Sequence, residues 1–86
     1  MQKVNVYAQY PKGGSYYKSV YATESTTIND ILSICGLHTI AASVYLNSVR
    51  LNKQQLNRQI SSFKIKGYIF LSLRYGEQFE SRKAGL

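Results

Sequence analysis

The stretch FKIKGYIFLSLRYG, residues 63–76, alternates apolar and polar residues and becomes more hydrophobic toward its end. A period of two residues is typical of a β-strand that buries one face. The residues expected on the buried face are Ile69, Leu71 and Leu73, and those expected on the opposite face are Tyr68, Phe70 and Ser72. We expect a strand across this stretch, and the rest of the chain must supply its partners.

Two further strands are expected at the N-terminus. KVNVYAQY (3–10) alternates in the same way, and YYKSVYAT (16–23) is rich in the aromatic and β-branched residues that favour strands. Between them PKGGS (11–15) contains one Pro and two Gly, which favour a turn. The three segments predict a β-hairpin. The residues expected on its core face are Val4, Val6, Ala8, Val20 and Ala22, and its outward aromatic residues are Tyr7, Tyr17 and Tyr21.

The segment TTINDILSICG (26–36) changes the period. Its apolar residues fall at i, i+3, i+4 and i+7, which is one face of a helix. They are Ile28, Ile31, Leu32 and Cys35. Thr27 and Asp30 have the spacing of a capping box, and Gly36 is a suitable C-terminal stop. We expect one helix that begins at about Thr27, ends at Gly36 and buries Cys35 as the last residue of its apolar face.

The remaining elements are short. SVYLNSVRLN (43–52) predicts two brief strands about a turn at Asn47-Ser48. KQQLNRQISSF (53–63) is polar, with apolar residues spaced for a short helical turn.

This order of elements is similar to the ubiquitin-like β-grasp family. TINDIL (27–32) resembles the threonine-led helix start of that family, and VYLNSVRL (44–51) resembles its short third strand, the turn and the following strand. LSLRYG (71–76) resembles its final strand and exit. The resemblance implies an α+β fold, with a four- to five-stranded mixed sheet wrapped on one main helix. It also implies that the first and last strands pair in parallel at the sheet centre.

The chain departs from the family at the exit. In ubiquitin-like modifiers and sulfur carriers the last strand runs into a free Gly-Gly terminus that threads a narrow enzyme channel. Here Tyr75 stands in place of the first Gly, and ten residues follow Gly76. We therefore expect no conjugation. We expect a β-grasp domain at residues 1–76 and a polar tail at residues 77–86 that contacts a partner through Phe79.

The composition indicates the number of domains and the cellular compartment. A chain of 86 residues with 44% hydrophobic content is ordinary for one globular domain. Its single cysteine, Cys35, excludes an internal disulfide, which fits a reducing compartment. No signal peptide or span of ~18 apolar residues is visible. We expect an intracellular (cytoplasmic) protein or one held inside a particle, with no membrane span.

The charge is strongly basic. Eleven Lys and Arg against four Asp and Glu give a formal net charge of +7, and no acidic residue occurs from Ile31 to Gly76. Such a field favours acidic partners, namely nucleic acid, an anionic surface or an acidic protein face. A role in solubility alone remains the alternative.

Aromatic residues are expected to gather on the outer face of the sheet. They are Tyr7, Tyr17, Tyr21, Tyr45, Tyr68 and Phe70, with Arg50, Lys66 and Arg74 at the rim. By the resemblance, Tyr45, Tyr68 and Phe70 match positions of the main recognition patch of ubiquitin. Aromatic residues with Arg are frequent anchors of protein interfaces. The alternative is that these tyrosines only pair across strands, which stabilises sheets.

These features predict a non-catalytic binding module, a ubiquitin-like domain that docks onto a protein partner as a small component of a larger assembly. The alternative is a basic protein that binds single-stranded nucleic acid or RNA, or a structural component of a viral or ribonucleoprotein particle. Paired carboxylates, a metal-ligand cluster and a phosphate-binding loop are all missing from the sequence. We expect no enzyme activity, catalytic residue, metal, cofactor or small-molecule substrate.

Overall fold

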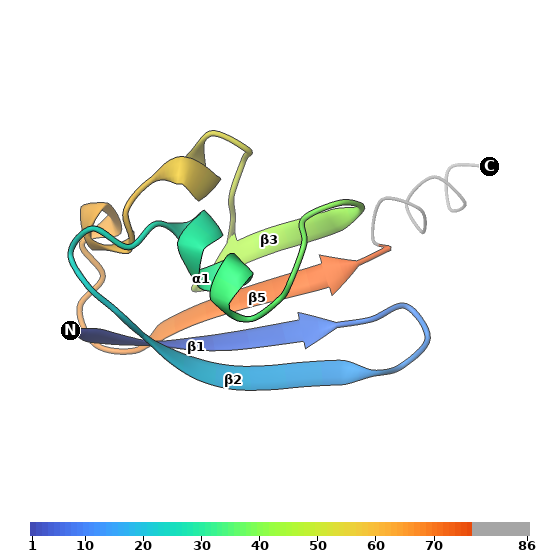
Figure 1. Cartoon of the computed structure of the whole chain (residues 1–86). Coiled ribbons are helices and arrows are strands. Elements are labelled where there is room, and N and C mark those ends of the chain that lie inside the picture. The colour runs from blue at the N-terminus through green and yellow to red at the C-terminus, as the bar shows by residue number, and fades with distance from the viewer. Residues whose placement is uncertain (77–86) are drawn as a thin grey trace.

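The computed structural model describes residues 1–76, so the tail and its Phe79 lie outside the described residues. Five strands form one sheet in the order β2-β1-β5-β3-β4. They are β1 (Gln2–Gln9), β2 (Ser15–Ala22), β3 (Ala42–Leu46), β4 (Val49–Arg50) and β5 (Ile69–Tyr75). β1 and β5 pair in parallel at the centre, and the other pairs are antiparallel (Figure 1). The predicted α+β fold, with a mixed sheet on one main helix, is confirmed.

The helix α1 (Ile28–Ile34) begins where the capping box predicts. Thr27 accepts a hydrogen bond from the Asp30 backbone N–H at 3.0 Å, and the Asp30 carboxylate accepts one from the Thr27 N–H at 2.9 Å. Gly36 follows with φ of 71°, a left-handed conformation that favours glycine. A helix of seven residues is marginal alone, so α1 depends on its packing against the sheet.

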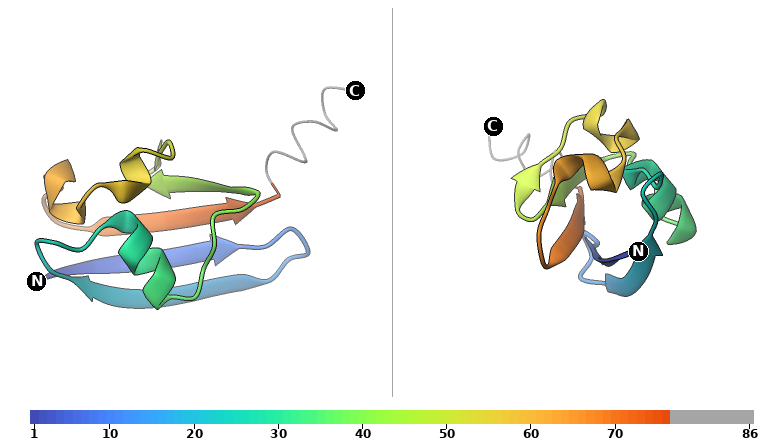
Figure 2. Two further views of the ribbon diagram at one scale, coloured as in Figure 1. Left: turned by 45° about the horizontal axis from the view of Figure 1, so that its top comes forward. Right: turned by 90° about the vertical axis from the view of Figure 1, so that its left-hand side faces the viewer.

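Two 3₁₀ helices complete the layer beside α1. η1 (Gln55–Asn57) and η2 (Ile60–Phe63) occupy the polar stretch that was predicted to make a helical turn. The two views of Figure 2 show α1, η1 and η2 on one side of the curved sheet. We call that side of the sheet the covered face and the other side the open face.

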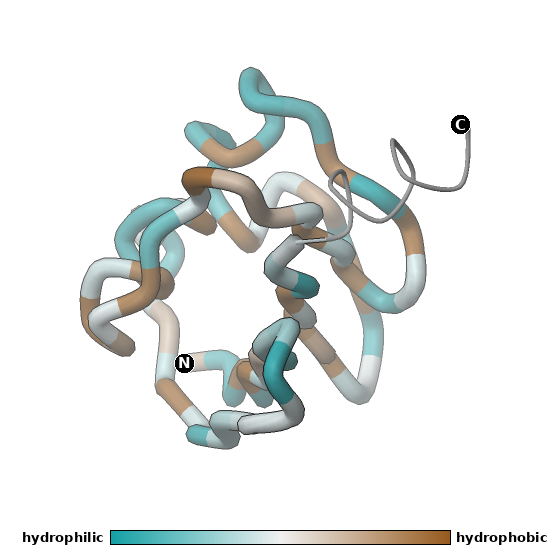
Figure 3. The backbone as a smooth tube through the Cα atoms, turned by 90° about the vertical axis from the view of Figure 1, so that its right-hand side faces the viewer, coloured by the Kyte–Doolittle hydropathy of each residue, from teal (hydrophilic) through white to brown (hydrophobic). Residues whose placement is uncertain are grey.

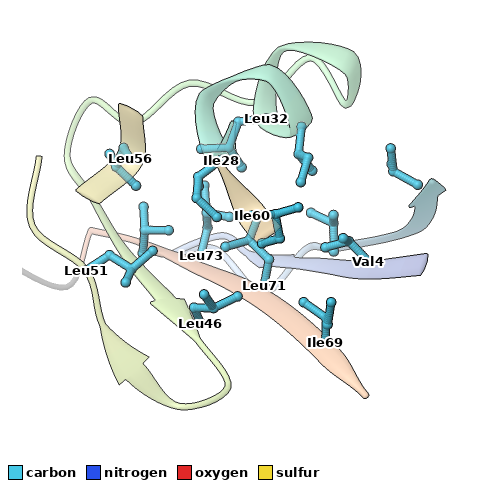
Figure 4. Close-up of a cluster of buried hydrophobic side chains, with 14 of the residues drawn as sticks. Val4, Ile28, Leu32, Leu46, Leu51, Leu56, Ile60, Ile69, Leu71 and Leu73 are labelled. Carbon is cyan, nitrogen blue, oxygen red and sulfur yellow. The ribbon is translucent and has the colours of Figure 1, made fainter. Parts of the chain in front are cut away.

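The core lies between the covered face and the helices. Leu32 and Ile28 of α1 point down toward Leu71 and Leu73 of β5, and Ile60 of η2 lies between the two layers (Figure 4). The residues predicted to face inward on the hairpin and on β5 are all buried. Seen from one end of the sheet, hydrophobic (brown) and hydrophilic (teal) residues are interspersed along the chain (Figure 3). Alternation therefore assigned both faces correctly.

Two predictions need correction. The last strand begins at Ile69 and not at Phe63, because η2 ends at Phe63 and Lys64 turns the chain with φ of 53°. Phe63 and Ile65 keep the alternation going because both pack against the core from outside a strand. Cys35 is half-buried and not fully buried, because it is the C-cap of α1 and lies at the margin of the core. Within residues 1–76 no helix is long and apolar enough to cross a bilayer.

Candidate interaction surface on the open face

Strand register arranges the open face in rows. One row crosses all five strands and consists of Tyr17, Tyr7, Ser72, Tyr45 and Arg50. Because directly opposed residues share a face, the outward tyrosines of the hairpin and of β3 lie on one surface.

The next row toward the start of β5 carries the aromatic residues of that strand. Phe70 lies opposite Asn5, and Tyr68 precedes β5 by one residue. Tyr21 lies opposite Lys3 at the hairpin end. The predicted aromatic residues therefore share the open face.

Three of these rings form a continuous stack. The ring centroids of Tyr7 and Phe70 are 6.3 Å apart, and those of Phe70 and Tyr68 are 6.1 Å apart, with interplanar angles of 27° and 23°. Tyr68 is 63% exposed, whereas Tyr7 and Phe70 are half-buried by their neighbours. Partial desolvation raises the pKa of Tyr68 above its ordinary value, and the nearby Tyr17 adds to the rise. The stack is an apolar strip along the two central strands.

Asn5 is the one outward residue of β1 that is almost wholly buried, at 5% exposure. Its side-chain oxygen accepts hydrogen bonds from the hydroxyl groups of Tyr17 at 3.0 Å and of Ser19 at 2.9 Å. Its Nδ2 donates to the carbonyl oxygen of Ile69 at 3.4 Å. This network fixes the hydroxyl end of Tyr17, so part of the open face is held in place before any partner arrives.

The charges on the open face are basic. The guanidinium of Arg74 lies over the Tyr45 ring, 5.5 Å from its centroid, and Arg50 is paired with Tyr45 from β4. Lys3 projects from β1, and Lys66 is exposed on the connection into β5. The two acidic residues within residues 1–76, Glu24 and Asp30, lie outside the sheet, in the β2–α1 connection and in α1.

Two shallow hollows flank the aromatic stack. One has a volume of about 330 Å³ and is lined by Tyr7, Tyr45, Phe70 and Arg74 among others. The other, of about 440 Å³, is lined in part by Lys3, Asn5, Tyr17 and Tyr68. The surface therefore offers a ridge of rings with a recess on either side, and each recess has a basic side chain in its wall.

The exit of β5 is fastened to the body of the domain. The Tyr75 ring stacks on Tyr10 with a centroid distance of 5.2 Å, and His38 meets it edge-on at 5.1 Å. The Tyr75 hydroxyl donates to the His38 carbonyl oxygen. Burial is the main reason that the pKa of Tyr75 is raised, and Tyr10 adds to it.

Gly76 has its own structural reason to be glycine. Its φ is 80°, and a Cβ at this position would meet Cγ of Pro11 at 2.8 Å. Its N–H donates to the Ala41 carbonyl oxygen at 2.8 Å. The Tyr75-Gly76 pair is thus a packed end of the sheet. Its tyrosine ring stacks on Tyr10, and its glycine lies where Pro11 leaves no room for a Cβ.

Solved structures with this architecture are ubiquitin-like. A ubiquitin-like protein from the hyperthermophilic archaeon Caldiarchaeum subterraneum aligns with a TM-score of 0.50 and 10% identity, over 84% of this chain and 92% of its own. The ubiquitin-like domain of an Arabidopsis thaliana protein aligns with a TM-score of 0.51 and 12% identity, over 85% of this chain and 77% of its own. The fold is a ubiquitin-like β-grasp. No family model and no curated protein matches the sequence.

The roles of two residues, Asn5 and Tyr75, were not predicted from the sequence. It did not identify Asn5 as the buried acceptor for Tyr17, because that role depends on the neighbouring strand. It did not assign Tyr75, although alternation from Leu71 and Leu73 places this ring on the covered side, where it meets Tyr10. The alternation along the last strand was therefore sufficient to predict the side of the sheet on which Tyr75 lies.

Proposed function

We propose that the chain is a non-catalytic binding module that docks onto a protein partner through the open face of its sheet, as a small component of a larger assembly. The ubiquitin-like fold is generally that of a protein-interaction module. The observation that carries the proposal is the stack of Tyr7, Phe70 and Tyr68 between two hollows. Rings of this kind are favourable anchors, because each buries a large apolar area and a tyrosine can keep its hydroxyl hydrogen-bonded when its ring is covered.

The partner should present acidic groups around an apolar centre. Lys3, Arg50 and Arg74 surround the rings, and no acidic side chain projects from the strands of the described sheet. Opposite charge across an interface speeds association and selects among partners. Contact with the aromatic stack would supply most of the affinity, and the basic rim would supply orientation.

Single-stranded nucleic acid or RNA is the second candidate, and the stacked rings are the observation that favours it. Bases stack on aromatic side chains within basic grooves, and each stacked base contributes ~1–3 kcal/mol. A small basic component of a viral or ribonucleoprotein particle would use the surface in this way. The rows of tyrosines and the basic side chains around them fit this chemistry as well as they fit a protein partner.

The first experiment uses the full chain, immobilised and exposed to native extract with and without nuclease. Two open-face variants, Tyr68→Ser and Arg74→Gln, are compared with Ile34→Ser and Lys12→Gln. Ile34 is 57% exposed on α1, and Lys12 lies in the hairpin turn, so the controls remove a similar side chain elsewhere. We expect the open-face variants to lose the captured protein and the controls to keep it.

The outcomes separate the candidates. A protein that stays bound after nuclease treatment, and is lost only with the open-face variants, agrees with the protein-docking proposal. Loss of all bound material on nuclease treatment, with log affinity falling linearly against log salt, would favour nucleic acid instead. Equal capture by all four variants would contradict both candidates.

The proposal also holds that the chain is neither an enzyme nor a conjugated modifier. Tyr75 is packed between Tyr10 and His38, and Gly76 is crowded by Pro11, so the exit is part of the domain. Mass spectrometry of protein from its native source tests this directly. We expect the mature chain to continue past Gly76. A mature end at Gly76 in isopeptide linkage to a lysine would overturn this part of the proposal.

A further inference from the structure

A third hollow lies at the β3 edge of the sheet, apart from the aromatic stack. Its volume is about 760 Å³, which is within the range of small-molecule sites. It is enclosed by residues 39–44, where the chain enters β3, and by residues 50–56, where it leaves β4 and forms η1. Two of the residues that line it also lie on the open face, because Ser43 is opposite Arg74 and Arg50 is opposite Tyr45.

The walls of this hollow are held by hydrogen bonds. Asn52 and Gln55 cap each other, since each backbone N–H donates to the side-chain oxygen of the other, at 2.8 and 2.9 Å. Leu51 N–H donates to the Val44 carbonyl oxygen at 2.8 Å, which ties one wall to β3. The side chains of Asn52 and Gln55 are thereby engaged, and the shape of the hollow is set without a ligand.

The charged side chains of the hollow are all basic. Arg50 and Lys53 line the hollow, both are exposed, and neither has an ion-pair partner among the described residues. Of residues 1–76, no acidic residue lines it. The lining also includes Leu51 and Leu56, which belong to the buried core cluster. The site therefore combines two positive charges with an apolar wall.

Ser43 supplies the second, independent observation. It lines the hollow, is 3% exposed, and its Oγ has no hydrogen-bond partner within residues 1–76. A buried hydroxyl without a partner destabilises a fold, because the hydrogen bonds that it made to water are not replaced. The Ser43 hydroxyl could therefore donate a hydrogen bond to an anion bound in this basic hollow.

We infer that this hollow binds a small organic anion, that is a carboxylate or phosphate joined to an apolar body. Arg50 and Lys53 hold the negative charge, the Ser43 hydroxyl donates to one of its oxygens after a change of side-chain rotamer, and the leucines contact the apolar body. The ligand is bound and not converted. The site lies apart from the stack of Tyr7, Phe70 and Tyr68, but it shares Arg50 with the open face, so a bound anion would take up one cation of the basic rim.

The test is an NMR titration of the ¹⁵N-labelled full chain with phenyl phosphate and with benzoate. Inorganic phosphate and benzyl alcohol are the comparison probes, because the first lacks the apolar body and the second lacks the charge. We expect saturable amide shifts confined to residues 39–44 and 50–56 with the two organic anions. We expect about tenfold weaker binding of inorganic phosphate, and no saturable shift with benzyl alcohol.

Variants then assign the roles. Arg50→Gln and Lys53→Gln should each weaken phenyl phosphate binding by up to about tenfold, while Lys12→Gln should leave it unchanged. Ser43→Ala should weaken binding and raise the thermal unfolding midpoint, because it removes a buried hydroxyl that has no partner in the free protein. A purely structural role for Ser43 would not give these opposite effects. Shifts that stay linear, that spread over the whole domain, or that survive the Arg50→Gln, Lys53→Gln double variant would overturn the inference.

Discussion

The covered and open faces of the sheet are built from the same strands but from different kinds of side chain. The covered face is aliphatic, with Val4, Val6, Leu71 and Leu73 fully buried under α1. The open face is aromatic, and most of its rings are tyrosines. Aliphatic side chains suit permanent burial, whereas an amphipathic ring tolerates water and still offers apolar area to a partner. The covered face therefore stabilises the fold, and the contrast supports our proposal that the open face binds a partner.

The strongest test of this contrast is Leu71→Ala on the covered face. Leu71 is fully buried at the centre of β5, so truncation removes packed methyl groups and leaves a cavity. We expect a loss of about 2–5 kcal/mol in the free energy of unfolding, measured by urea denaturation. A loss below about 1 kcal/mol would mean that the core near β5 is able to collapse or is loosely packed.

Asn5→Ala tests whether the open face has a rigid part of its own. The substitution removes the acceptor shared by the Tyr17 and Ser19 hydroxyls and the donor to Ile69. Water can replace some of these bonds at the exposed Tyr17, so we expect a loss of about 1–2 kcal/mol in urea denaturation. Ser19→Ala is the control and should cost less, because Asn5 keeps its bonds to Tyr17 and Ile69. Equal losses would show that Asn5 does not organise this network.

The difference between Leu71 and Asn5 also shows how much of the fold can be predicted from the sequence. The period of two identified both faces, and the change of period identified α1 with its cap at Thr27, because these patterns are local. The burial of Asn5 was not predictable in this way, since it depends on side chains from β2 and β5. The start of β5 was misplaced because Phe63 and Ile65 continue the alternation through a turn at Lys64.

The candidate surface was predictable only in part, for the same reason. Alternation placed the six aromatic residues outward, and register then brought Tyr7, Phe70 and Tyr68 into contact. The hollows beside them depend on rotamers and on loop paths that no local pattern encodes. The half-burial of Cys35 likewise follows from where α1 ends, at Ile34, two residues before the predicted end at Gly36.

Tyr75→Phe tests the packed end of β5, where an aromatic ring lies on the covered side of the sheet. The ring should keep its stacking on Tyr10 and lose only the hydroxyl bond to the His38 carbonyl oxygen. We expect a cost of about 1 kcal/mol at neutral pH, measured by thermal or urea unfolding. Tyr21→Phe, on the open face, is the matched control and should have almost no effect.

The dependence of stability on alkaline pH provides a second test of Tyr75. Burial raises the folded-state pKa of Tyr75, so the neutral hydroxyl is favoured in the folded protein. Its contribution is fully present below the unfolded pKa of ~10 and is lost as the pH rises through the folded pKa. Tyr75→Phe should therefore lose less stability than the wild type between pH ~8 and ~11. Identical alkaline limbs would show that Tyr75 is not protected by its surroundings.

The smallest expected change in stability is also the one that tests the contrast most directly. Tyr68→Ser removes the outermost ring of the stack, and Ile34→Ser removes an exposed apolar side chain from α1 on the other side of the molecule. Because both residues are more than half exposed, we expect each variant to lie within about 0.5 kcal/mol of the wild type in urea denaturation. Their binding should nevertheless differ, with capture of the partner weakened only by Tyr68→Ser. If Tyr68→Ser costs as much stability as a core substitution, the stack is part of the fold and the open face is not free for a partner. If both variants bind like the wild type, the aromatic residues on this face serve cross-strand pairing alone.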